Sequence, residues 1–190
     1  MPRMRAALAL IALALVLAPT PGAAAAPALG PLNVQLSDLP AGFQLFAEQR
    51  LNTAAAAAKA DGVLAATYIS AGVLRANDRL YNGGTAAAPM LVFSLVYLLQ
   101  SAADAHQFYR RFVHRTPRGA VHEPGAFGDE GIDVYGTTTS NGTTVRINLA
   151  IFRRGAYLTW LGVQPVTTSF AAPQVIHLAM LVDRRIQRAR

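Results

Sequence analysis

The 190-residue chain contains no cysteine, and lysine and tryptophan each occur only once. Without cysteine the protein can form no disulfide, no iron–sulfur cluster and no thiolate zinc site. The single lysine, Lys59, is not preceded by the glycine pattern of a phosphate-binding P-loop. These absences exclude several large classes of enzyme before any residue that is present is considered.

The remaining enzyme motifs are also missing. No two histidines have the close spacing of a helical zinc site, and each is expected to be an ordinary helix or surface residue; the four are His106, His114, His122 and His177. The stretch "YISAG" places Tyr68 where a nucleophile elbow requires glycine. A Ser-His-Asp set drawn from distant segments stays open, since geometry defines such sets. We therefore expect no metal, no cofactor and no assigned catalytic residue, and we favour a non-enzymatic role.

The amino terminus has the pattern of an export signal. Arg3 and Arg5 precede an uninterrupted apolar run of thirteen residues, Ala6–Ala18, and Ala24–Ala26 supply the small residues of a cleavage site. A bilayer-spanning helix needs about 20 apolar residues, so this run is too short for a membrane anchor. The sequence predicts a signal peptide at 1–26 and a secreted or extracytoplasmic protein with no transmembrane segment after cleavage.

Removal of the signal leaves 15 basic and 10 acidic residues, a net charge of +5. The arginines are scattered in pairs and do not cluster with aromatic residues, so we expect no nucleic-acid partner. A basic surface suits an anionic cell envelope instead. We expect a loose leader at 27–36 and a single domain at 37–190, with a core sufficient for that length.

The pattern of apolar residues and turn formers predicts an α+β domain. Its antiparallel sheet is expected to end in a three-stranded meander around the Asn141-Gly142 turn, with two to three helices packed on one face. Residues 77–89 are rich in turn formers and predict a loop. The expected strands are 43–50, 63–74, 90–99, 132–139, 143–152 and 156–163. The expected helices are 54–58, 101–114 and 171–187.

The acidic stretch "GAFGDEGIDVYG" at 125–136 is the strongest candidate for chemistry. It does not fit a calcium loop, because the sixth position counted from Asp129 is valine and the twelfth is serine. Neighbours in an extended segment point to opposite sides, which disfavours Asp129 and Glu130 as an acid–base pair. A glycine-permitted turn, with Asp129 as a hydrogen-bond acceptor for nearby amides and Asp133 facing outward, explains the stretch better.

An anion could meet the arginine pair at the tip of the last hairpin. Trp160 is interpreted as a core residue of the final strand and not as part of a ligand site. The candidate binding residues are Asp129, Glu130, Asp133, Tyr135, Arg153 and Arg154.

Four phrases carry a family resemblance: "LSDLPAGF", "VFSLVYLLQSAADAHQFY", "FGDEG" and "IFRRGAYLTWLGV". Together they resemble small exported bacterial α+β domains of unassigned function. The order of elements is also similar to that of the extracellular sensor domains of mycobacterial serine/threonine kinases and of the PsbP-like fold. The resemblance covers most of residues 36–187. It implies a fold and an extracytoplasmic setting, and it assigns no catalytic residue.

Three hypotheses follow. The favoured one is an exported, non-enzymatic domain that binds a ligand or a cell-envelope protein. The second is a hydrolase-type enzyme that uses the carboxylates at 129–133 with a histidine, and it requires them to line a cleft. The third is an accessory protein of an envelope assembly. An apolar cavity between the sheet and the helices at 101–114 and 171–187 would favour ligand binding.

Overall fold

The computed structural model describes residues 28–85, 88–114, 116, 121–140, 143–164 and 172–190. The predicted signal peptide, the Asn141-Gly142 turn and the connection at 165–171 lie outside these residues. Among the described residues, seven antiparallel strands form one sheet in the order β1-β2-β3-β7-β6-β5-β4. The strands are β1 (Gln44–Leu51), β2 (Val73–Thr85), β3 (Ala88–Leu99), β4 (Val121–Pro124), β5 (Glu130–Ser140), β6 (Thr143–Arg154) and β7 (Tyr157–Gln164).

Within the described part of the chain, four helices and two short 3-10 turns accompany the sheet. They are α1 (Ala54–Ala60), α2 (Ala65–Ser70), α3 (Ala102–Val113), α4 (Ala172–Arg188), η1 (Gly30–Leu32) and η2 (Leu36–Asp38). The α+β class and the meander of β5, β6 and β7 are confirmed. The start of α3 is also as predicted, because the Ser101 hydroxyl accepts a hydrogen bond from the amide of Asp104 at 3.1 Å.

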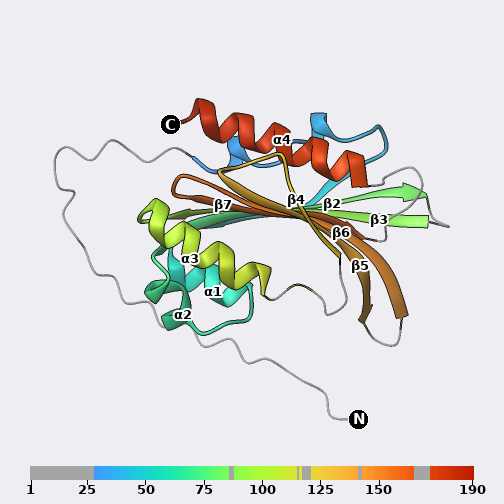
Figure 1. Cartoon of the computed structure of the whole chain (residues 1–190). Coiled ribbons are helices and arrows are strands. Elements are labelled where there is room, and N and C mark those ends of the chain that lie inside the picture. The colour runs from blue at the N-terminus through green and yellow to red at the C-terminus, as the bar shows by residue number, and fades with distance from the viewer. Residues whose placement is uncertain (1–27, 86–87, 115, 117–120, 141–142, 165–171) are drawn as a thin grey trace, which may run out of the picture.

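Helices cover both faces of the sheet, whereas the sequence suggested one (Figure 1). On one face α4 and the amino-terminal segment form a core cluster, and on the other α1, α2 and α3 form a second cluster. The central strand β3 explains the difference. Val92 and Val96 pack into the first cluster, while Leu95 and Leu99 pack into the second. A strand that is apolar on both faces needs a cover on each side.

The expected strand at 63–74 is wrong, because α2 occupies its middle and β2 begins only at Val73. The β-branched and aromatic residues there favour a strand locally. Tertiary packing overrides that preference: Tyr68 is completely buried, and its ring lies edge-on against Phe108 with centroids 5.1 Å apart. The helix therefore forms because it places one aromatic side chain beneath α3.

The expected loop at 77–89 is also wrong over its described part, since β2 continues through Asn82, Gly83 and Gly84. Paired strands flank this segment on both sides, with Asn82 opposite Gln44 of β1 and Leu91 of β3. A side chain at Gly83 would approach the ring of Phe43 to 2.5 Å. At Gly83, glycine permits close packing and does not make a turn.

The segment expected to be a loose leader is instead packed over its described part. Leu29, Leu32 and Val34 are buried in the core cluster shared with α4. Asn33 is fully buried, and its side-chain amide donates to the carbonyl oxygens of Asn77 and Ser94 at 3.0 and 2.9 Å. These hydrogen bonds satisfy the buried polar group and fix the segment across the sheet.

Candidate functional site

Four of the six predicted binding residues meet at the turn between β6 and β7. The carboxylate of Asp129 accepts hydrogen bonds from Arg154 Nη1 and from the backbone amide of Gly155, both at 2.8 Å. The amide of Gly155, followed by the charge of Arg154, lowers the pKa of Asp129. Asp129 is thus a hydrogen-bond acceptor for a backbone amide, as expected, but the amide belongs to the later hairpin.

Glu130 connects this turn to α3. Its carboxylate accepts a hydrogen bond from Arg153 Nε at 2.8 Å and lies 2.7 Å from Nδ1 of His106. Partial burial would raise the pKa of Glu130, but the hydrogen bonds from Arg153 and His106 outweigh it and lower the pKa. Through these two contacts Glu130 of β5 is joined to Arg153 of β6 and to His106 in the first half of α3.

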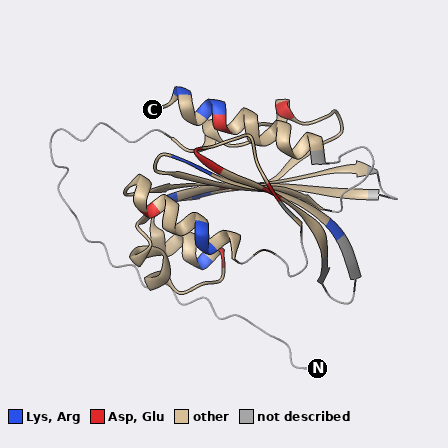
Figure 2. Ribbon diagram, in the orientation of Figure 1, with Lys and Arg blue, Asp and Glu red and all other residues tan. Residues whose placement is uncertain are grey.

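Arg154 connects the same turn to α4. Its Nε and Nη2 each donate to a different oxygen of the Asp183 carboxylate at 2.7 Å. Asp183 is buried, with 6% of its surface exposed. Figure 2 shows the charged residues of α4 gathered in its C-terminal half, where this contact lies. Such a bidentate arginine–carboxylate pair fixes geometry as well as charge.

The other two predicted residues lie further along β5. Asp133 was expected to face outward but is only 4% exposed, because it points to the face of the sheet that α4 covers, beside Ala150 of β6. Burial, and then the charge of Glu123, raises the pKa of Asp133 to about 6. The Tyr135 hydroxyl donates to Glu123 at 2.7 Å. All six side chains lie outside the cavity described next.

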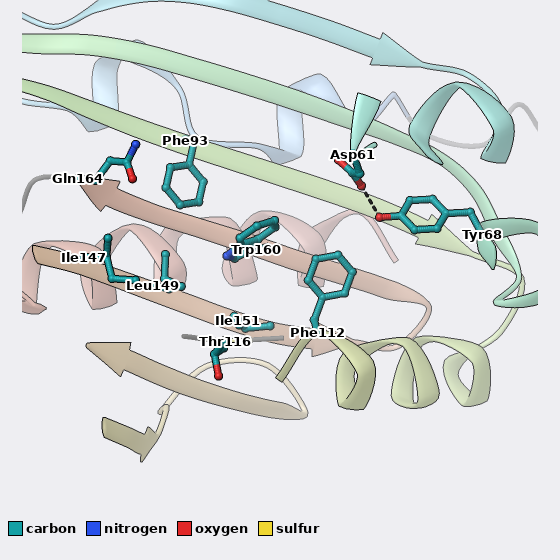
Figure 3. A pocket seen from close by; sticks show the side chains of 10 residues that line it. All are labelled: Asp61, Tyr68, Phe93, Phe112, Thr116, Ile147, Leu149, Ile151, Trp160 and Gln164. Carbon is teal, nitrogen blue, oxygen red and sulfur yellow. Dashed lines mark hydrogen bonds between the residues drawn. The ribbon is translucent and has the colours of Figure 1, made fainter. Parts of the chain in front are cut away.

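A cavity of about 490 Å³ lies on the opposite face, between α3 and the sheet (Figure 3). Its walls are mostly aromatic and branched aliphatic side chains, with a few polar groups among them. Such a volume and lining are typical of small-molecule sites, which occupy about 300–1,000 Å³. The lining residues are Asp61, Tyr68, Phe93, Phe112, Thr116, Ile147, Leu149, Ile151, Trp160 and Gln164.

Trp160 of β7 occupies the middle of the cavity wall. The ring of Phe93 lies 5.6 Å away between centroids and that of Phe112 5.4 Å, both in edge-to-face arrangements. This geometry is favourable for aromatic pairs and holds the indole in place. Two residues further along β7, Gly162 leaves room for its neighbours, since an added side chain would approach Leu149 to 2.5 Å and Phe93 to 2.7 Å.

The indole nitrogen of Trp160 is buried and has no hydrogen-bond partner among the described residues. An unsatisfied buried donor costs about 1–3 kcal/mol. The opposite situation holds at Asp61, whose carboxylate accepts hydrogen bonds from the hydroxyls of Tyr68 and, at 2.6 Å, Tyr97. The cavity therefore offers the unpartnered N–H of Trp160 in an apolar wall and, at one end, the Asp61 carboxylate, whose Oδ2 already accepts two hydrogen bonds.

A second carboxyl lies close to that acidic end. Asp78 of β2 stands opposite Leu95 of β3, which in turn stands opposite Trp160. Burial, and then the charge of Asp61, raises the pKa of Asp78 to about 6. Within the described chain the Asp78 carboxyl forms no hydrogen bond or ion pair. The end of the cavity near Asp61 thus has a negative potential that no arginine balances among the contacts described.

The described residues contain no group of three or more histidine, aspartate or glutamate side chains placed to hold a metal ion. They also contain no helix with the length and hydropathy needed to cross a bilayer.

Sequence comparison gives no match to a protein family or to a curated protein. Structure comparison finds the extracellular domain of PknH from Mycobacterium tuberculosis, which covers 82% of this chain and 93% of its own length at 11% identity. The TM-score is 0.48. The chain resembles that domain loosely. The predicted likeness to the extracellular domains of mycobacterial kinases is confirmed at this level.

The sequence reasoning missed the cavity because it treated Trp160 as core. A signal for it is present on one face of β7, where Trp160, Gly162 and Gln164 alternate. A strand face that meets a packed helix normally carries consecutive large apolar residues. A glycine and a glutamine beside the single tryptophan indicate that this face is incompletely filled.

Proposed function

We propose that this chain is an exported, non-enzymatic domain that binds a largely apolar small molecule in the cavity beneath α3. The cavity itself is the observation that carries the proposal. Its apolar wall would gain roughly 25 cal/mol for each Å² of apolar ligand surface removed from water. The apolar run and cleavage pattern at residues 1–26 support export.

The hydrolase hypothesis has less support. One contact that it needs is present, because Glu130 lies 2.7 Å from His106 Nδ1. The same carboxylate, however, accepts hydrogen bonds from Arg153, and its pKa is lowered, which makes it a poor general acid or base near neutral pH. Glu130 and His106 are also outside the lining of the cavity.

A neutral fluorescent probe, 1-N-phenylnaphthylamine, tests the proposal with the intact mature chain. We expect saturable binding to the wild type. The Ile147→Phe substitution fills part of the cavity and should weaken binding about tenfold or more. Loss of contact with even part of a ligand costs enough binding free energy for a change in affinity of that size.

The matched control is Ile69→Phe, the same change at a side chain that is 60% exposed on α2. It should bind the probe as the wild type does. Circular dichroism would establish that both variants are folded. This check is needed because added bulk in a packed region costs about 1–3 kcal/mol of stability. Absence of saturable binding to the wild type, or equal binding by Ile147→Phe, would refute the proposal.

A further inference from the structure

The polar groups of the cavity determine which kind of apolar molecule it can hold. The buried N–H of Trp160 has no partner among the described residues, and the indole lines the cavity between Phe93 and Phe112. A ligand oxygen placed against it would satisfy a donor that the fold leaves unsatisfied. The ligand is therefore expected to carry a hydrogen-bond acceptor within its apolar body.

The acidic end of the cavity limits the charge of the ligand. The Asp61 carboxylate accepts hydrogen bonds from Tyr68 and Tyr97 on its Oδ2 oxygen, so an acidic group stands at this end of the cavity. Asp78 adds a second carboxyl close enough to interact electrostatically with Asp61. Beside an apolar wall, two carboxyls at one end disfavour the approach of a third negative charge.

The shape of the lining is elongated. In Figure 3 Asp61 and Tyr68 lie at one end, Gln164 lies at the other, and Trp160 lies between them. The lining includes no lysine, arginine or histidine among the described residues. A carboxylate or phosphate head group would thus find no cation at either end, and a neutral molecule would leave no buried charge unpaired.

We propose that the cavity selects an elongated, uncharged, largely apolar molecule with a carbonyl acceptor, such as a neutral acyl ester or ketone, and excludes fatty-acid anions. The inference rests on the proposed function, because it presupposes that the cavity binds a small molecule. The Trp160 N–H donates to the carbonyl oxygen, and the apolar chain lies along Ile147, Leu149 and Ile151.

The test is competition of two matched compounds, methyl decanoate and decanoate, against bound 1-N-phenylnaphthylamine at pH 7.5. The two compounds share a chain and a carbonyl and differ in charge. We expect the ester to compete at a concentration about tenfold or more below that of the anion, because the anion must bury an unpaired charge. The Asp78→Asn variant should narrow this difference by improving decanoate binding, with the ester unchanged.

Asp133→Asn is the matched control, since Asp133 is a buried carboxyl on the opposite face of the sheet. It should leave the difference in competition between methyl decanoate and decanoate as it is in the wild type. Trp160→Phe should weaken ester binding about fivefold, the value of one net hydrogen bond, while retaining the probe.

The outcomes separate the two proposals. Equal competition by decanoate and the ester, with saturable probe binding, would overturn the selectivity and leave a binding function intact. Unchanged ester affinity in a folded Trp160→Phe protein would overturn the role of the indole donor. Absence of probe binding to the wild type would overturn the binding function itself, and this inference with it.

Discussion

At the scale of single residues, carboxyls of the same type differ in pKa because their surroundings differ. Asp78 is partly buried and Asp133 is buried, and burial, followed by the charge of a neighbouring carboxyl, raises the pKa of each to about 6. Asp129 and Glu130 have arginine partners, and the pKa of each is lowered. All four are plain carboxyls in the sequence, so their protonation depends on tertiary neighbours that no local pattern reveals.

The raised pKa of Asp133 predicts how stability changes with pH. In the unfolded chain an aspartate has a pKa near about 3.9, so the folded protein binds this proton more tightly. The stabilising contribution of the protonated form is therefore fully present below about pH 4 and is lost as the pH rises through about 6.

Asp133→Asn should remove the loss of stability that ionisation of Asp133 causes as the pH rises. We expect the variant to match the wild type in free energy of unfolding near pH 4 and to exceed it by about 3 kcal/mol at pH 7.5, since two pKa units correspond to roughly that energy. Urea unfolding at both values measures it. A difference between the two proteins that stays constant with pH would contradict the account.

At the scale of elements, the sequence predicted correctly those features that depend on neighbouring residues, such as the start of a helix. Thr53 caps α1, with its hydroxyl accepting from the Ala56 amide at 3.1 Å, and Ser101 caps α3 in the same way. The strand predicted at 143–152 is β6, but both of its faces are buried, with Leu149 and Ile151 in the cluster beneath α3 and Phe152 in the cluster beneath α4. The error at α2 occurred where burial of Tyr68 against Phe108 overrides strand preference, and the short edge strand β4 has too few residues to show a pattern.

The contact between α4 and the β6–β7 turn should contribute measurably to stability. Asp183→Asn removes the bidentate partner of Arg154 and leaves this arginine, whose side chain is only 18% exposed, with Asp129 as its remaining counter-charge. We expect a loss of about 2–4 kcal/mol, measured by urea unfolding at pH 7.5.

Arg50→Gln is the comparison for this prediction, because the side chain of Arg50 is 79% exposed and lies 3.9 Å from Glu48. An exposed pair of this kind contributes less than about 1 kcal/mol. If Asp183→Asn proved no more damaging than Arg50→Gln, the pair would not hold α4 to the turn.

At the scale of the whole molecule, the sequence was sufficient for the class of fold but not for its layers. The apolar residues at 90–99, interrupted only by Ser94, predicted the interior strand β3, yet only the tertiary structure shows that α4 covers one face and α1–α3 the other (Figure 1). The cavity lies on the face of the sheet that α4 does not cover, beneath α3 and with Trp160 in its wall.

The candidate site could be predicted from the sequence only in part. The residues at 129–133 attracted attention because charge is conspicuous in a sequence, and the structure places Asp129 and Glu130 in ion pairs within the fold. The cavity is lined by residues from six separate parts of the chain, between Asp61 and Gln164. Their convergence depends on strand register and helix placement, which are set by long-range contacts.

The most direct measurement of the central claim uses Trp160, the single tryptophan of the chain, as a reporter within the cavity wall. A fatty-acid methyl ester with bromine on its chain quenches an indole only at contact distance. Titration of the wild type should give saturable quenching that an excess of unbrominated ester reverses. Quenching that rises linearly with concentration, or that unbrominated ester does not reverse, would contradict a ligand-binding cavity beneath α3.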